Sequence, residues 1–328
     1  MAGFSHSPLF DARGNDVAHD PSVTVTARDL IDMAASAGVL QPLRTVSARA
    51  RRAGGHLSRV RGRGMDYQES RAYQAGDDIR AMDWRLMART VEPHTKMFSE
   101  ERERPVILAV DLSSGMFFAS RGALKAVQAA RTAAMFGWAA VSHGDRVGAL
   151  LFNGAHREIQ PRGGRAGILR VIRELVAHTD AKAALAVPAE ENRLNDALLR
   201  LRRLVRPGSL VILISDFYGL DEDSLAHLSF LRRHSELLAV RVLDPLERFA
   251  PPAGRYAVTD GHDRSQLDAA AGKERALYGE LLLAHHAAVE SLLQRGRVPL
   301  LGLATDDHVG ESIASQLHSG TRKQGGIA

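Results

Sequence analysis

The fold of this 328-residue chain is decided by two apolar stretches, Val106-Ile-Leu-Ala-Val-Asp111 and Leu210-Val-Ile-Leu-Ile-Ser-Asp216. Each is a short, continuous apolar run of the kind found in strands that are buried on both faces of a parallel sheet. Each run also ends in an aspartate. In a parallel sheet the carboxyl ends of the strands share one edge, so both carboxylates are expected at the edge where such sheets bind ligands.

The sequence around these strands alternates between two periodicities. Apolar residues at steps of three and four predict amphipathic helices over 121–143, 166–177, 194–205, 224–234, 266–295 and 309–317. Further apolar runs predict strands over 146–152, 156–160, 237–243 and 298–304, with an edge strand over 255–258. This alternation predicts a doubly wound, mostly parallel α/β sheet over residues 105–317.

The residues before 105 have a different character. Residues 1–61 are interpreted as an N-terminal extension with a short helix, N-capped by Thr26, and an arginine-rich linker. Residues 62–104 form a polar segment punctuated by aromatic residues, interpreted as a small β-rich subdomain. Residues 318–328 are interpreted as a flexible tail.

Composition excludes several classes of protein. Hydrophobic residues make up 45% of the chain and charged residues 25%, which is typical of a globular protein. The chain has no cysteine, which excludes disulfides, thiol catalysis and cysteine-ligated zinc. No window of 18 apolar residues and no secretory signal is found, so we expect a cytoplasmic protein without a membrane span.

The strand ends suggest a metal site. Asp111 and Ser113 follow the first strand, and on an extended path they point the same way; Asp216 follows the second. A carboxylate and a hydroxyl beside a helix N-terminus suit Mg²⁺, which takes oxygen ligands. The alternative is structural, because Asp and Ser after a strand also form turns and N-caps.

Other chemistries find less support. The chain has no nucleophile elbow, no phosphate loop and no His-Glu-x-x-His. The arginine-rich segment 44–63 offers nucleic-acid or anionic-surface binding as an alternative, but it lacks aromatic residues for base stacking, which favours a solvated linker. A metal-assisted hydrolase using Asp111 and Asp216 is a further alternative, although no general base is evident.

The block from residue 62 to 101 adds a resemblance. It contains Gly-x-Gly, Glu-x-Arg-x-Tyr, Gly-Asp-Asp-x-Arg and Asp-Trp at fixed spacing, and it resembles the bacterial family of domain of unknown function 58. The matching residues are Gly62, Gly64, Glu69, Arg71, Tyr73, Gly76, Asp77, Asp78, Arg80, Asp83 and Trp84.

The resemblance implies both a fold and a role. Members of that family resemble von Willebrand factor A domains in their second part and often occur beside MoxR-type AAA+ ATPases. A non-enzymatic adaptor that works with such an ATPase and with client proteins is therefore expected here.

The resemblance also implies a degenerate metal-ion-dependent adhesion site. Asp111, Ser113 and Asp216 match its pattern, Gly115 stands where a second serine is usual, and Asn192 stands at the threonine position. Mg²⁺ is the expected ion at such a site, which has lost one hydroxyl ligand.

The signature block itself has two interpretations. The acidic and basic residues Asp77, Asp78, Arg80 and Asp83, together with Arg85, form either a buried salt-bridge lattice or a partner-recognition surface. The lattice is favoured, because buried charges need partners. Trp84 is its expected apolar anchor, and Glu69, Arg71 and Tyr73 belong to the same signature.

Overall fold

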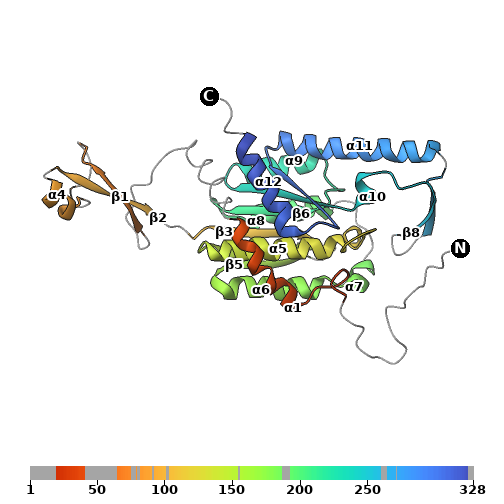
Figure 1. Cartoon of the computed structure of the whole chain (residues 1–328), viewed down its shortest axis with the longest axis horizontal. Helices are drawn as coiled ribbons and strands as arrows, with labels where there is room; N and C mark the ends of the chain where they lie inside the picture. Colours follow the sequence, from red (N-terminus) through yellow and green to blue (C-terminus); the bar gives the residue numbers. More distant parts are fainter. Residues whose placement is uncertain are drawn as a thin grey trace. The chain divides into compact units, whose positions relative to one another are not determined.

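The computed structural model describes residues 20–40, 65–74, 79, 82–90, 92–100, 103–153, 156–186, 193–259, 264–270 and 272–323. The chain divides into two compact units (Figure 1). One consists of residues 1–47 and 104–328, and the other of residues 48–103.

The larger unit is built on a six-stranded sheet with the order β10-β7-β6-β3-β4-β5. All neighbouring strands are parallel except β5, which is antiparallel to β4. The strands are β3 (Pro105–Asp111), β4 (Arg146–Phe152), β5 (His156–Gly163), β6 (Leu210–Ser215), β7 (Glu236–Leu243) and β10 (Leu300–Ala304). From β3 the chain adds β4 on one side and later β6 on the other, so the strand order reverses beside β3.

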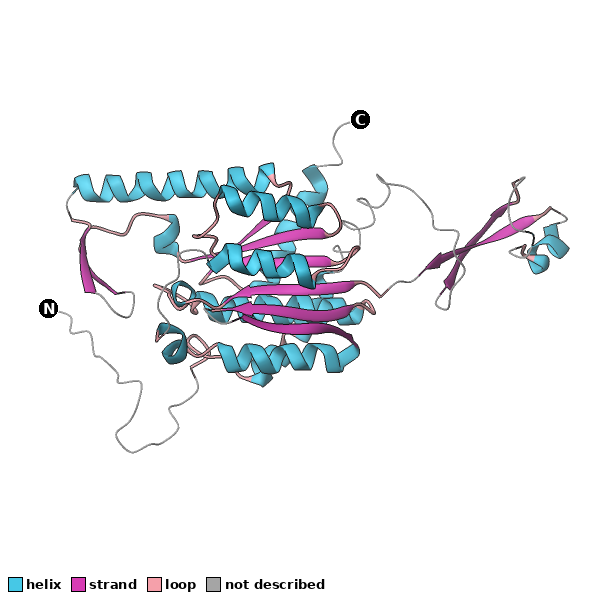
Figure 2. Ribbon diagram, turned by 180° about the vertical axis from the view of Figure 1, so that it is seen from behind, coloured by secondary structure: helices cyan, strands magenta, loops and turns pink. Residues whose placement is uncertain are grey.

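Helices cover both faces of this sheet (Figure 2). Along β3, Val106, Leu108 and Val110 pack into one core, while Ile107 and Ala109 pack into the other. The first core is covered by α5 (Lys125–Ser142), α6 (Gly164–His178) and α12 (Val309–Lys323). The second is covered by α8 (Arg193–Leu204), α9 (Glu222–Arg232) and α11 (Gly272–Arg295). The predicted mostly parallel α/β sheet is confirmed.

Two predicted helices begin later than expected. The residues from 264 to 268 form a strand, β9 (Arg264–Asp268), which pairs with β8 (Arg255–Thr259) in a separate two-stranded sheet. The predicted helix over 266–295 is therefore wrong in its first residues, because cross-strand pairing takes them. The helix predicted from 121 begins at Lys125, since Gly122 has a φ of 70°, which a right-handed helix does not allow.

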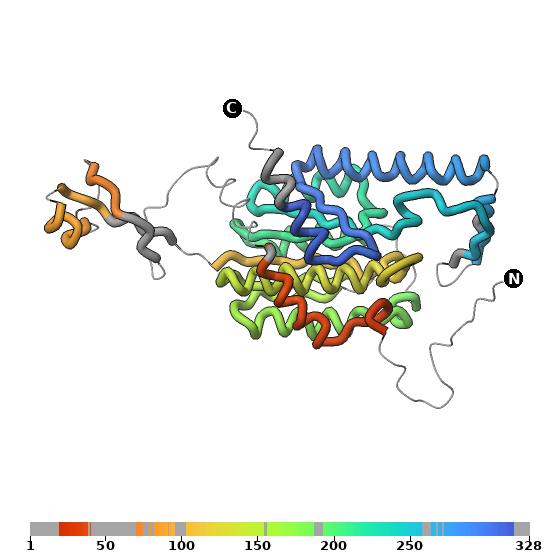
Figure 3. The backbone as a smooth tube through the Cα atoms, in the orientation of Figure 1, coloured from red at the N-terminus to blue at the C-terminus, as the bar shows by residue number. Residues whose placement is uncertain are grey.

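The N-terminal residues belong to the larger unit. The predicted N-cap Thr26 is confirmed: its side chain accepts from the Asp29 amide in a capping box that begins α1 (Ala27–Asp32). Leu30 in this helix is fully buried, and its carbonyl accepts a 3.0 Å hydrogen bond from Trp138 Nε1 in α5. Figure 3 shows this segment running along α5 and α6; after it come α2 (Ala34–Ala37) and the 3-10 turn η1 (Gly38–Leu40).

The smaller unit holds an antiparallel pair, β1 (Met65–Ala72) and β2 (His94–Glu100), with α4 (Trp84–Thr90) between them in sequence. Asp83 is buried and caps α4, accepting from the Leu86 amide at 3.2 Å and from Ser70 Oγ at 2.9 Å. Trp84, in the first turn of α4, is 58% exposed, so it is not buried within the smaller unit itself, and its role as an anchor on the larger unit stays a prediction.

Several signature residues lie outside the described part of the chain. These are Gly62, Gly64, Gly76, Asp77, Asp78 and Arg80, together with the arginine-rich segment 44–63. Glu69, Arg71 and Tyr73 follow one another along β1 and its end, where the Arg71 side chain donates to the Ala72 carbonyl at 3.2 Å. Within the described residues, no helix is long and apolar enough to cross a membrane.

Candidate functional site at the carboxyl edge of the sheet

Three neighbouring parallel strands each deliver an aspartate to the same edge of the sheet. Asp111 is the last residue of β3, Asp216 follows β6 and Asp244 follows β7. All three side chains are buried. The predicted convergence of strand-end aspartates therefore has the expected topological basis, and a third aspartate joins the two that the sequence indicated.

Asp111 is bound on both oxygens. Its Oδ1 accepts from the Ser113 amide at 3.0 Å, and its Oδ2 accepts from Ser215 Oγ at 2.7 Å. Burial, together with the nearby Asp216 carboxylate, outweighs the lowering effect of these hydrogen bonds and raises the pKa of Asp111 to about 6. Asp111 is thus a buried carboxyl group that titrates closer to neutrality than an exposed aspartate.

Asp216 is also bound on both oxygens. Its Oδ1 accepts from the Tyr218 amide at 3.1 Å, and its Oδ2 accepts from Lys125 Nζ at 2.8 Å. A Cβ at Gly115 would lie 3.7 Å from Asp216 Oδ2, so the loop after β3 passes over this carboxylate. The predicted residues Asp111, Gly115 and Asp216 consequently gather at one place.

The cation of this site is Lys125, a residue that was not among the predicted site residues. Lys125 is 1% exposed, and its Nζ donates to Asp216 Oδ2 and, at 2.6 Å, to Glu247 Oε1. Burial alone would lower the pKa of Lys125, but the attraction of Asp216 and Glu247 outweighs it and raises the pKa. The lysine is the first residue of α5, where periodicity alone gives no sign of a buried charge.

Asp244 connects the loops around the lysine. It accepts from both the amide and the hydroxyl of Ser120 at 2.6 Å and from Thr305 Oγ1 at 3.0 Å. It also caps the short helix α10 (Pro245–Arg248), where Glu247 Oε2 accepts from the Asp244 amide at 2.9 Å. An aspartate directly after a predicted strand, followed by Pro and Glu at capping-box spacing, is the signal that could have found this pair.

One aromatic ring lies close to the buried lysine, and two more belong to segments bound to it. The ring of Tyr218 is 47% exposed, stacks on His285 with a centroid distance of 4.4 Å, and lies 5.6 Å from Lys125 Nζ. The preceding Phe217 has a φ of 62°, an unusual conformation for a bulky residue that is favoured here by the Ser215 Oγ contact to its amide. Phe118 and Phe249, in the segments bound to Lys125, are 41% and 66% exposed.

The donor set does not fit a divalent cation. A buried ammonium already contacts Asp216, each oxygen of Asp111 already accepts one hydrogen bond, and Gly115 offers no hydroxyl. Among the described residues, no group of three His, Cys, Asp or Glu side chains is placed to hold a metal ion. Ser113 is half-buried next to Asp111, and the predicted ligand Asn192 lies outside the described residues.

The same bonds leave little scope for nucleophilic catalysis. Ser215, the hydroxyl nearest to Asp111, is 2% exposed, donates to that carboxylate and accepts from the Phe217 amide at 3.0 Å. Its proton and lone pair are both used inside the protein. A metal-assisted hydrolase would need Asp216 free, whereas Lys125 neutralises it. The arrangement therefore ties together the loops at this edge of the sheet, with the half-exposed ring of Tyr218 beside the lysine.

The chain is similar to proteins whose role is not described. Residues 69–287 match the family described as Protein of unknown function DUF58. Uncharacterized proteins of Mycobacterium bovis and Mycobacterium tuberculosis are 32% identical over 258 residues, which span 77% of this chain and 78% of each relative. Both are similar along most of their length.

The comparison with solved structures found BatB from Bacteroides thetaiotaomicron, a conserved hypothetical protein, with 13% identity and a TM-score of 0.41. Another is an aerotolerance-related membrane protein from Bacteroides fragilis, with 11% identity and a TM-score of 0.42. Each match covers 67% of this chain and 99% of the other.

Proposed function

The chain belongs to the family described as Protein of unknown function DUF58, and from that membership we propose that it is a non-enzymatic protein-interaction module. Its larger unit is taken to be a von Willebrand factor A-like domain, and its partner a MoxR-type AAA+ ATPase that acts with it on client proteins. The carboxyl edge of the sheet is the proposed binding face.

One observation carries this proposal: the ammonium of Lys125 stands in the acidic edge of the sheet, bound to Asp216 and Glu247. A metal-ion-dependent adhesion site captures a partner's carboxylate on an ion with an open position. Lys125 is 1% exposed and two of its three N–H donors are bound to carboxylates of this chain, so it offers no such position to a partner. We infer that it replaces the metal as a structural cation, and that recognition passes to the side chains above it.

The exposed aromatic residues supply that recognition. Phe118, Tyr218 and Phe249 come from the three segments that Lys125 and Asp244 tie together. Tyrosine and other aromatic residues contribute strongly to interfaces because they bury a large area at low entropic cost. The buried ion network holds their backbone in place, so the face is formed before a partner arrives.

The proposal is tested by capture of a purified MoxR-type ATPase from the same organism on the full chain. We expect Tyr218→Ala to weaken capture by about tenfold or more, as loss of an aromatic anchor does. Phe230→Ala is the matched control: its ring is 39% exposed, but it lies near the end of α9, just before β7 begins at the opposite edge.

The same experiment separates the metal-free version from the metal-mediated one. With EDTA present, capture should be unchanged, and calorimetry should detect no Mg²⁺ binding to the wild-type chain. Loss of capture in EDTA with restoration by Mg²⁺ would contradict the role given to Lys125. Equal capture by the Tyr218→Ala and wild-type chains would remove the proposed face.

A further inference from the structure

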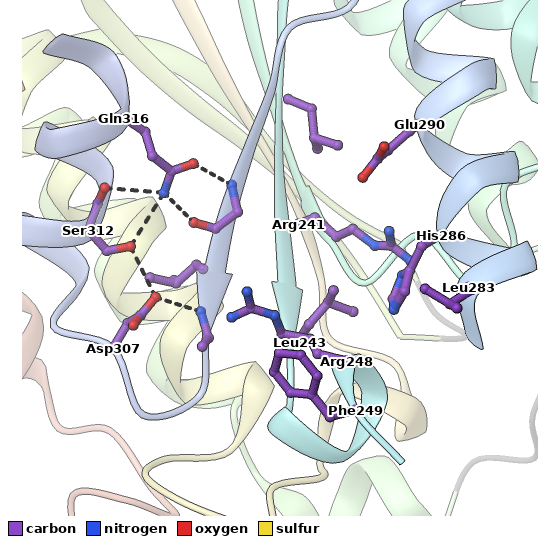
Figure 4. A pocket seen from close by; sticks show the side chains of 14 residues that line it. Arg241, Leu243, Arg248, Phe249, Leu283, His286, Glu290, Asp307, Ser312 and Gln316 are labelled. Atoms are coloured by element: carbon purple, nitrogen blue, oxygen red, sulfur yellow. Dashed lines mark hydrogen bonds between the residues drawn. The ribbon is translucent and has the colours of Figure 1, made fainter. Parts of the chain in front are cut away.

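A pocket lies between β7, β10, α11 and α12, next to the buried ion network (Figure 4). It has a volume of about 700 Å³, within the range of small-molecule sites. Its walls combine apolar side chains with charged ones, which is the usual character of a ligand pocket. None of its lining residues was singled out by the sequence.

The floor of the pocket is open because β10 has a glycine at its centre. Gly302 pairs with Arg241 of β7, so a side chain at 302 would stand beside the arginine on the same face of the sheet. A Cβ at Gly302 would meet only Gln316 Oε1, at 4.0 Å. The Gln316 amide bonds instead to the Gly302 backbone, accepting from its N–H at 2.8 Å and donating to its carbonyl at 2.6 Å.

Arg241 lines this space as an incompletely paired cation. It is 4% exposed, and its Nε donates to the Asp216 carbonyl at 3.2 Å. Its Nη2 is buried and has no hydrogen-bond partner among the described residues. A buried donor without an acceptor costs on the order of 1–3 kcal/mol, and more when it is charged. An anionic oxygen entering the pocket would satisfy this nitrogen.

The other lining groups define the size and charge of the ligand. Arg248, exposed at the end of α10, adds a second guanidinium, while Glu290 of α11 adds one carboxylate. The remaining acid, Asp307, is already used: its Oδ2 accepts from the Ala304 amide at 2.8 Å and from Ser312 Oγ at 3.0 Å. The lining thus holds two guanidinium groups and two carboxylates, and among the charged groups of the lining only Arg241 has a buried nitrogen without a partner in the described residues, so an entering anion is expected to bind there.

Apolar side chains lie between and beside these charged groups (Figure 4). They come from β7, β10, α10 and α11: Leu243, Leu300, Phe249 and Leu283. We propose that this pocket binds a carboxylate carried on an apolar group, with the guanidinium of Arg241 on the carboxylate and the apolar group against these side chains. A guanidinium matches a carboxylate in geometry, because both are planar and present parallel donors and acceptors.

The carboxylate can come from a peptide C-terminus or from a free apolar acid, and the probes distinguish the two. N-acetyl-phenylalanine represents the first and hexanoate the second, each with its uncharged amide as control. Binding is followed by the NMR shift of the Gly302 amide in the full chain. Whichever of the two acids represents the actual ligand should bind at least about tenfold more tightly than its own amide.

Three variants test the assignment. Arg241→Met should reduce acid binding by about tenfold or more, as should Gly302→Leu, which fills the pocket without removing a charge. Because Gly302→Leu leaves Arg241 and its bond to the Asp216 carbonyl intact, it keeps the test decisive even if Arg241→Met unfolds. Arg203→Met, an exposed arginine on α8, should bind like the wild type.

Several results would overturn the proposal. These are equal affinity for acid and amide, unchanged binding by Gly302→Leu, or no saturable shift with either acid. Inorganic phosphate binding more tightly than both acids would overturn the carboxylate assignment as well. Phe249 belongs both to this pocket and to the proposed partner face, but none of these outcomes depends on capture of an ATPase and no variant is common to the two experiments.

Discussion

The ammonium of Lys125 donates a 2.8 Å hydrogen bond to the Asp216 carboxylate, and the lysine itself is only 1% exposed. Glu247 accepts a second bond from the same nitrogen. The positive charge at the carboxyl edge of this sheet therefore belongs to the polypeptide itself. It joins the first turn of α5 to the loop after β6 and to α10.

Lys125→Ala is expected to destabilise the protein by about 3–5 kcal/mol, because it leaves two buried carboxylates without their cation. Urea unfolding monitored by circular dichroism measures this free energy. Lys273→Ala, at an exposed position of α11, should change it by no more than about 0.5 kcal/mol. An equally small effect of Lys125→Ala would mean that the ion pair is not formed in solution.

The stability of the protein should depend on pH through Asp111. Its pKa is raised from 3.8 to about 6 in the folded chain. Between these values the folded protein keeps a proton that the unfolded chain releases, so the contribution of Asp111 to stability falls as pH rises through this window, by up to ~3 kcal/mol. Above the pKa of the folded state this contribution of Asp111 to stability is completely lost, and below the pKa of the unfolded state it is fully present.

Asp111→Asn removes this titration while retaining an acceptor for the Ser113 amide. The difference in unfolding free energy between wild type and variant should fall from pH 4 to pH 6.5 and stay level above pH 7. Parallel curves for the two proteins over this range would show that Asp111 titrates normally.

Substitutions at Gly122 and Gly144 distinguish two ways in which an added side chain destabilises the protein: backbone strain at positive φ, and steric overlap with a neighbouring loop. Both have a positive φ, 70° and 78°, but a Cβ at Gly122 would overlap the carbonyl oxygen of Thr305, whereas a Cβ at Gly144 meets nothing within 4 Å. Gly144→Ala should cost about 1–2 kcal/mol from the left-handed conformation alone. Gly122→Ala should cost clearly more by thermal or urea unfolding, and equal costs would contradict the close approach of the two loops.

The segment before residue 40 is expected to stabilise the larger unit. Leu30 is fully buried in the core shared with α5 and α6. Leu30→Ala should therefore lower the unfolding free energy by about 2–5 kcal/mol, the usual cost of such a cavity. Ala35→Gly in α2 is exposed and should cost only about 1 kcal/mol through helix propensity. Equal effects would mean that α1 does not pack against the sheet domain.

Much of the fold could be predicted because its two central strands, β3 and β6, are continuous apolar runs. The apolar runs that end at Asp111 and Asp216 predict strands at the centre of a sheet that is covered on both faces. In the structure they form neighbouring parallel strands. The helix predicted over 266–295 includes residues 266–268 of the strand β9, because so short a strand carries too little periodicity and the strand with which it pairs is not visible locally.

The site was predictable only in part, for a physical reason. Strand-end aspartates can be read from the sequence because strand direction places them. The partner that determines what they do, Lys125, is brought near Asp216 by the path of the chain across the sheet, over a separation of 91 positions. A lysine at the start of an amphipathic helix is ordinarily solvated, so neither its burial nor its second acceptor, Glu247, is marked by spacing.

Gln316 has a consequence for assembly. By offering its own amide to the backbone N–H and carbonyl of Gly302, it occupies the outward-facing groups at the centre of β10. A strand from another molecule cannot pair there without first displacing that side chain. On this flank the sheet is thereby limited to its own six strands, and association with other proteins is directed to side-chain surfaces instead of growth by strand addition.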